Sequence, residues 1–286
     1  MVRKIISCLN NNFYHLIHSA NIWVLIGYLF IWSDITARGV RLFCRSVGEK
    51  ATCFLFPLLM DSSYFSMLFL LGIFILFLDC PFLSKISDYE IPKMGRKIWL
   101  TGQFGYMMGA SVFYVAVANI ICNLLLLPNI TISSEWGRVF YTILRTSART
   151  QFDVRLDGNG SVLSRFSAVE GWILQTAITV GVCFTLGSLL FTVGLWIGRK
   201  VAVIVVGLII LYPIILESGF NSRIYYCSPG SWVQLGKIND GLNGMLPSPS
   251  YIFIVIIAVN IILYLFNFIK ISKLEWSCKR EENDNV

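Results

Sequence analysis

Six long apolar stretches dominate the pattern of hydrophobic and polar positions along this chain. They are Ser19–Ser33, Pro57–Leu78, Leu100–Leu127, Gly171–Ile197, Val201–Leu216 and Tyr251–Ile269. A helix needs about 20 mostly apolar residues to cross the hydrocarbon core of a bilayer, because each residue rises only about 1.5 Å and lipid offers the backbone no hydrogen-bond partners. The pattern therefore predicts an all-α polytopic membrane protein with six transmembrane helices.

The first 18 residues follow a different pattern. Apolar side chains recur at three- and four-residue spacing and polar ones fill the other side, the apolar set being Ile5, Ile6, Leu9, Phe13, Leu16 and Ile17. This periodicity predicts an amphipathic helix over residues 1–18, which either lies in the membrane interface or extends the first span. His15 and His18, the only histidines, are expected to be interfacial side chains of this helix rather than a metal pair.

Composition agrees with a membrane protein built as one domain over residues 1–286. Hydrophobic residues make up 56% of the chain and charged ones 14%, with a mean hydropathy of +0.70, whereas about a quarter of residues are charged in a soluble protein. The net charge of +7 is spread over every segment between the stretches, which argues against nucleic-acid binding. The eight cysteines are all single, so we expect free thiols, with a Cys44–Cys53 bridge left open.

The distribution of Lys and Arg predicts the orientation in a cell membrane. If both termini are cytoplasmic, the inner segments carry 12 of the 23 basic residues in about half as many positions as the outer segments, as the positive-inside rule requires. The outer segments are then 34–56, 128–170 and 217–250, the last with re-entrant elements. Segment 128–170 contains SEWGRVFYTILRTS, whose apolar residues have helical spacing and predict a short outer helix.

The chain lacks the motifs of an enzyme or a nucleotide-binding protein. The nearest approach to a phosphate-binding loop, GSWVQLGKI, has the wrong glycine spacing and places Ile238 where a hydroxyl would hold magnesium. We find no HExxH, no GxSxG and no pair of intramembrane aspartates. We therefore expect no catalytic, cofactor or metal site in this chain.

Polar residues inside the stretches are candidates for a substrate pathway, because burying them in a membrane is costly. Asn119, Asn123 and Gln175 are the main ones, and interhelical hydrogen bonding is the alternative that we favour. Pro213, Glu217 and Trp232 are candidates for an outer gate. The motifs GYMMG (Gly105–Gly109) and GLWIG (Gly194–Gly198) indicate close helix packing.

Two motifs resemble those of a known family. The segment DCPFL…YEIPKMGRKIWLTGQ, between the second and third stretches, resembles the corresponding loop in permease subunits of type-2 ATP-binding-cassette (ABC) exporters. The segment YYCSPGSWVQLGKI (Tyr225–Ile238) is similar to the Ser-Pro-x-Ser-Trp segment that many of these permeases carry between their last two spans. With the six stretches and the amphipathic start, the resemblance covers essentially the whole chain.

The resemblance implies a transport subunit that is not itself an enzyme. It would act as a dimer with a second copy or a close paralogue, and two cytoplasmic ABC ATPase subunits would bind ATP and Mg²⁺ and dock on the loop 79–99. The implied docking residues are Asp79, Pro81, Phe82, Pro92, Lys93, Gly95, Arg96, Lys97 and Trp99. The alternative is that these bases only mark the cytoplasmic side, with Trp99 at the membrane interface.

The implied substrate is hydrophobic or amphipathic, such as a peptide antibiotic, a drug or a lipid, and the sequence does not choose among them. A rival hypothesis from another class is a membrane sensor or assembly protein that binds a peptide through its outer segments without transport. Co-purification of an ATPase separates these two hypotheses.

Overall fold

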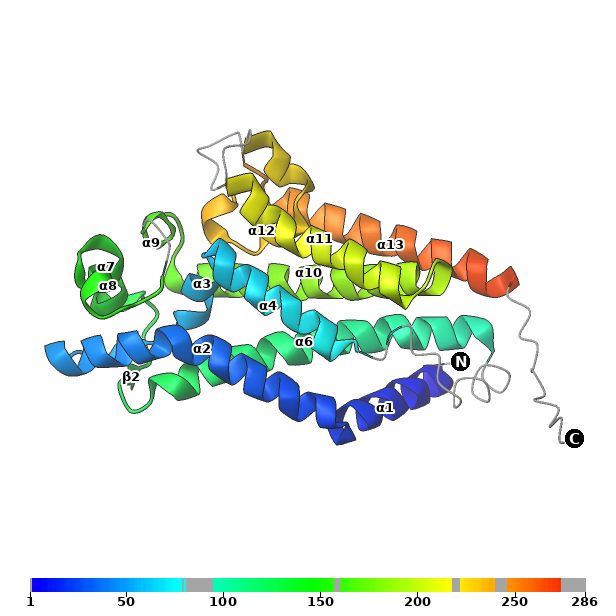
Figure 1. Cartoon of the computed structure of the whole chain (residues 1–286), viewed down its shortest axis with the longest axis horizontal. Helices are drawn as coiled ribbons and strands as arrows, with labels where there is room; N and C mark the ends of the chain where they lie inside the picture. Colours follow the sequence, from blue (N-terminus) through cyan, green and yellow to red (C-terminus); the bar gives the residue numbers. More distant parts are fainter. Residues whose placement is uncertain are drawn as a thin grey trace, which may run out of the picture.

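The computed structural model is an all-α bundle, and it describes residues 2–78, 80, 95–156, 160–217, 222–239 and 246–273. This part of the chain contains twelve α-helices, two 3-10 helices and one pair of two-residue strands. Four long helices make up most of the bundle and run side by side along its length (Figure 1): α2 (Ala20–Val47), α6 (Arg96–Leu126), α10 (Ala168–Trp196) and α13 (Pro249–Lys273).

These four helices are long and apolar enough to cross a membrane. Helix α2 has 28 residues, α6 has 31 and α10 has 29. The apolar part of α13, Pro249–Ile271, has 23. At about 1.5 Å per residue, each one exceeds the roughly 30 Å of a bilayer core. Four candidate membrane-spanning helices indicate a multi-pass membrane protein.

The second and fifth stretches form shorter helices, so six spans are not established by the described helices alone. Pro57–Leu78 contains the end of α3 (Leu55–Met60) and all of α4 (Ser63–Leu76), which is apolar but only 14 residues long. The two helices are separated at Asp61 and Ser62. Val201–Leu216 lies within α11 (Arg199–Glu217), a helix of 19 residues with Pro213 inside it.

The amphipathic start is a separate helix, α1 (Val2–His18), which ends before α2 begins at Ala20, so it does not simply extend the first span. Figure 1 shows the angle between α1 and α2. One side of α1 packs against a row of glycines on α6, where Cys8, Leu9 and Phe13 lie over Gly102, Gly105 and Gly109 respectively. Asn12 Nδ2 also donates to Gln103 Oε1 at 3.1 Å. The GYMMG motif of α6 is thus a docking surface for α1.

One end of the bundle carries a small ordered cap made from the segments that follow α2 and α6. Strands β1 (Ala51–Thr52) and β2 (Ile130–Thr131) pair in parallel and tie them together. The predicted short helix is confirmed as α7 (Gly137–Arg145), with Val139, Phe140 and Ile143 buried. Helices α8 (Ala148–Gln151) and α9 (Ser161–Arg165) complete the cap, which lies at the left in Figure 1. We call this end the cap end.

The opposite end holds the start of α1, the start of α6, the α10–α11 turn and the end of α13 (Figure 1). We call it the loop end, because α6, whose first turn ends the predicted loop 79–99 in the sequence, begins there. Near the cap end, η1 (Ser222–Cys227), α12 (Pro229–Trp232) and η2 (Leu235–Lys237) fold back over the ends of α4, α10 and α11. These short helices lie between the last two stretches, within the segment 217–250 for which the sequence predicts re-entrant elements.

The cysteines in the described residues are free thiols. Cys44 is buried in α2 and Cys53 is partly buried after β1, with no bridge between them. No group of three His, Cys, Asp or Glu side chains that could hold a metal ion occurs in the part of the chain that the structure describes.

Candidate functional site

The predicted docking residues divide into two groups. Asp79, Pro81, Phe82, Pro92 and Lys93 lie outside the described residues, whereas Gly95, Arg96, Lys97 and Trp99 form the start of α6. Gly95 has a positive φ of 92°, a backbone conformation that glycine adopts without strain, and the helix begins at the next residue. The structure therefore places the root of the predicted docking loop on the first turn of α6.

Trp99 has a different environment from the one expected of an interface anchor. Its side chain is fully buried, and its ring centroid lies 6.1 Å from that of Phe191 on α10. Trp99 lies on the side of α6 that packs against α10, while Arg96 and Lys97 are exposed. The indole thus fixes the root of the loop to the bundle core.

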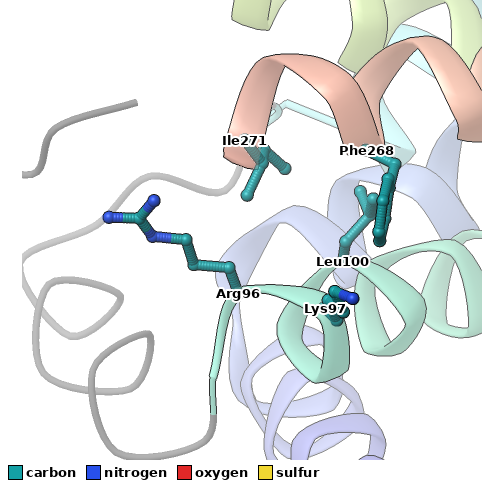
Figure 2. A pocket seen from close by; sticks show the side chains of 5 residues that line it. All are labelled: Arg96, Lys97, Leu100, Phe268 and Ile271. Carbon is teal, nitrogen blue, oxygen red and sulfur yellow. The ribbon is translucent and has the colours of Figure 1, made fainter. Parts of the chain in front are cut away.

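Arg96 and Lys97 border a pocket at the loop end (Figure 2). The pocket has a volume of about 190 Å³ and is lined by Arg96, Lys97 and Leu100 from α6 and by Phe268 and Ile271 from α13. Lys97 Nζ lies 5.1 Å from the centroid of the Phe268 ring, within the range of a cation–π contact. The pocket combines an apolar wall with two cations.

A second cluster of aromatic rings and cations lies close by at the same end. Trp196, the last residue of α10, stacks on Phe266 of α13 with ring centroids 4.3 Å apart. Lys270 Nζ lies 4.8 Å from the centroid of the Trp196 ring. Aromatic rings with basic side chains are typical of the membrane–water interface, so the loop end has the composition of an interface.

Two of the candidate pathway residues are used in helix packing. Asn119 Oδ1 accepts a hydrogen bond from Trp172 Nε1 at 2.8 Å, which joins α6 to α10. Gln175 Nε2 donates to the carbonyl oxygen of Val233 and thereby joins α10 to the segment after α12. The Asn119 contact joins two long helices, whereas the Gln175 contact joins a long helix to the segment that follows α12. The buried Oδ1 of Asn123 and the buried Oε1 of Gln175 have no partner among the described residues.

The sequence reading missed a regular polar ladder between α10 and α13. Asn260 Nδ2 donates to Thr185 Oγ1 at 2.8 Å, and Asn267 Nδ2 donates to Thr192 Oγ1 at 2.7 Å. Both the asparagines and the threonines are seven residues apart, two helical turns, so the same contact repeats along the pair. This equal seven-residue spacing is the feature of the sequence that could have predicted the ladder.

The segment Ser228–Ile238, which we call the plug, is anchored by buried polar contacts. Gln234 is fully buried; its Oε1 accepts from Ser63 Oγ and its Nε2 donates to Ser66 Oγ, each at 3.1 Å. Gly236 N donates to Asp61 Oδ1 at 2.6 Å. A Cβ on Gly236 would lie 2.9 Å from that oxygen, so a side chain would press on this bond. The plug is therefore bound to the break between α3 and α4.

Of the three predicted gate residues, Trp232 belongs to the plug and Pro213 contacts it. Trp232 is buried and its Nε1 donates to the carbonyl oxygen of Tyr225 at 2.9 Å. The Pro213 ring packs so closely on Gly230 that a Cβ there would lie 2.7 Å from Pro213 Cγ. Glu217 is the last residue of α11. The structure thus joins α11 to the plug through Pro213 and Gly230.

No known protein family, curated protein or solved structure matches this chain. The functional argument therefore rests on the residues and contacts described above.

Proposed function

We propose that this chain is the membrane-spanning permease subunit of a type-2 ABC exporter. Its six spans would be α2, the α3–α4 pair, α6, α10, α11 and α13, and two such units would form the transport pathway between them. A separate ATPase would bind at the loop end, which is cytoplasmic in this proposal, and drive a hydrophobic or amphipathic substrate across the cell membrane.

The arrangement of the connecting segments supports six crossings. The cap and the plug lie toward one end of the bundle, while the start of α1, the α10–α11 turn and the end of α13 lie at the other (Figure 1). A chain with six crossings and both termini on one side requires this alternation. The break at Asp61 is compatible with a crossing, because α3 and α4 together with the intervening turn cover residues 55–76.

The observation that carries the proposal is the position of α6. This helix begins where the predicted docking loop ends, and it packs against α1, α2, α10 and α13. Buried Trp99 ties its first turn to α10, so a displacement of the loop by a bound ATPase would be passed to most of the bundle.

The expected substrate class follows from the use of polar side chains. Asn119, Gln175, Asn260 and Asn267 all make hydrogen bonds within the bundle. Many outward-facing side chains of α11 and α13 are aliphatic, including Ile204, Leu208, Ile257 and Ile261. Such surfaces suit lipid, a second copy or an apolar substrate rather than a hydrated ion.

Affinity purification in mild detergent tests the proposal. The intact chain is compared with a loop variant, Lys93→Glu, Arg96→Glu and Lys97→Glu, and with a control variant, Arg199→Glu, Lys200→Glu and Lys270→Glu. The control reverses three charges at the same end in residues that lie outside the loop 79–99 in the sequence. We expect an ATPase and its activity to accompany the intact chain and the control and to be lost from the loop variant. Equal recovery with all three chains, or none with the intact chain, contradicts docking.

A membrane sensor is a second candidate, favoured by the ordered cap. Trp136 is buried and its Nε1 donates to the carbonyl oxygen of Phe166 at 2.9 Å, while Thr52 Oγ1 donates to the carbonyl oxygen of Trp136 at 2.8 Å. A cap held this firmly could present a binding surface. Recovery of an outer peptide or protein without any ATPase in the same purification would favour the sensor.

A further inference from the structure

The pocket between α6 and α13 has two chemically distinct sides. Leu100, Phe268 and Ile271 supply an apolar wall, and Arg96 and Lys97 supply positive charge at its border (Figure 2). Its volume of about 190 Å³ is larger than the roughly 150 Å³ of a cavity that accepts benzene. None of the described residues that line it is acidic. The lining is therefore complementary to an anion that carries an apolar chain.

Backbone geometry adds to the positive side. The N–H groups in the first turn of a helix have no partner within the helix, and Lys97, which lines the pocket, lies in the first turn of α6. Gly95, immediately before α6, has no side chain with which to cap them. The N-terminal end of a helix dipole also favours negative charge, and α6 is 31 residues long. Both effects act at the place where Arg96 and Lys97 begin.

The depth of the pocket matches the boundary of a bilayer. Trp196, Phe266 and Lys270 form an aromatic and cationic cluster at the same end of the bundle. About one turn further into the helix pair, Thr101 Oγ1 and Tyr264 Oη lie 3.0 Å apart and satisfy each other. The pocket thus offers charge on its outer side and apolar contact on its inner side, as a lipid crossing the interface would require.

We propose that this pocket binds an anionic phospholipid, with the head-group phosphate at Lys97 and the first turn of α6 and the upper acyl chain against Leu100, Phe268 and Ile271; the Arg96 side chain points away from these residues (Figure 2). The lipid would hold the root of the loop against α13. Lys97 stays close to Phe268 and directs its charge toward the head group. This site needs no ATPase, so it stands or falls separately from the proposed transport function.

Native mass spectrometry of the purified full-length chain tests the site. The chain is titrated with phosphatidylglycerol, with phosphatidylcholine of the same acyl chains, and with glycerol phosphate, which has the head group alone. One basic residue near a membrane surface is worth about fivefold in affinity for an anionic lipid. We expect one phosphatidylglycerol to bind about fivefold more tightly than phosphatidylcholine, and glycerol phosphate to be neither retained nor competitive.

Single substitutions distinguish the pocket from diffuse surface charge. Lys97→Gln should weaken phosphatidylglycerol binding about fivefold, and Lys97→Arg should restore it. Lys270→Gln, which removes one charge at the same end beside Trp196, should leave it unchanged. Phe268→Ala should weaken both lipids, because it removes part of the apolar wall. Size-exclusion profiles establish that each variant is folded.

Three results would overturn the proposal. Equal binding of phosphatidylglycerol and phosphatidylcholine would show that the pocket does not recognise an anionic head group. Equal losses in Lys97→Gln and Lys270→Gln would assign the preference to general surface charge. Displacement of phosphatidylglycerol by glycerol phosphate would show a free-phosphate site in which the apolar wall has no part.

Discussion

Gln234 shows how one side chain can hold the plug in place. Its amide reaches Ser63 and Ser66, more than 160 positions earlier in the chain, and all three side chains are buried. An amide in such a site must keep both of its contacts, because a buried polar group left without a partner costs about 1–3 kcal/mol. Gln234 is thus the residue that ties the plug to α4.

Replacing Gln234 by alanine should therefore destabilise the protein by about 1–3 kcal/mol and lower its melting temperature. Thermal unfolding of the purified chain in detergent measures the change. Gln151→Ala is the matched control, because Gln151 is an exposed glutamine in the cap and its loss should have little effect. An unchanged melting temperature for Gln234→Ala would mean that the plug is not anchored through this side chain.

At this scale the sequence identified many of the polar residues but not their partners. Asn119 and Gln175 were recognisable as costly amides inside apolar stretches; Asn119 bonds to another long helix, while Gln175 bonds to Val233 after α12. Gln234 lies within the motif YYCSPGSWVQLGKI, yet nothing local points to Ser63. Trp99 was expected at an interface because it follows a basic run, whereas its place is set by packing with Phe191.

The packing of α1 on α6 is the element-scale feature that a single experiment can test most cleanly. A Cβ at Gly102 would lie 3.1 Å from Cβ of Cys8, near the distance of about 3.5–4.5 Å in a disulfide. Small residues at this contact allow the two backbones to approach closely. The distance exists only if α1 lies on α6 rather than away from the bundle.

We therefore expect Gly102→Cys to cross-link with Cys8 after mild oxidation, so that maleimide labelling of both thiols after denaturation is lost and is then restored by reductant. Two controls isolate the pair. Gly27→Cys places a thiol where no atom lies within 4 Å of the new Cβ, and Cys8→Ser with Gly102→Cys removes the partner. Both should remain fully labelled. The same full labelling in Gly102→Cys would place α1 elsewhere.

Helical elements were predictable wherever one period governs a long stretch. The apolar stretches locate α2, α6, α10 and α13, and the spacing in SEWGRVFYTILRTS locates α7. The break between α3 and α4 was not predicted, since hydropathy averages over Asp61 and ignores its contact with Gly236, 175 positions away. The sequence also did not decide whether α1 ends at His18 or continues into the first span. An interfacial helix and a helix that extends the span have the same apolar pattern.

On the scale of the whole molecule, α6 links the loop end to most of the bundle. Its first turn carries the root of the predicted docking loop and borders the pocket, and its length packs against α1, α2, α10 and α13. At the other end, the plug is tied both to the α3–α4 break and, through Gly230 and Pro213, to α11. Movement at the loop could thus reach the plug through contacts between packed helices.

The most direct measurement is site-specific photo-cross-linking in native membranes. A photoreactive residue is placed at Lys93, in the predicted docking loop, or at Lys50, next to the cap strand β1. The proposal predicts that position 93 captures a protein with a phosphate-binding loop and ATPase activity, and that position 50 does not. Capture of no ATPase at position 93, with a partner protein captured at position 50, would contradict the permease proposal and favour the sensor.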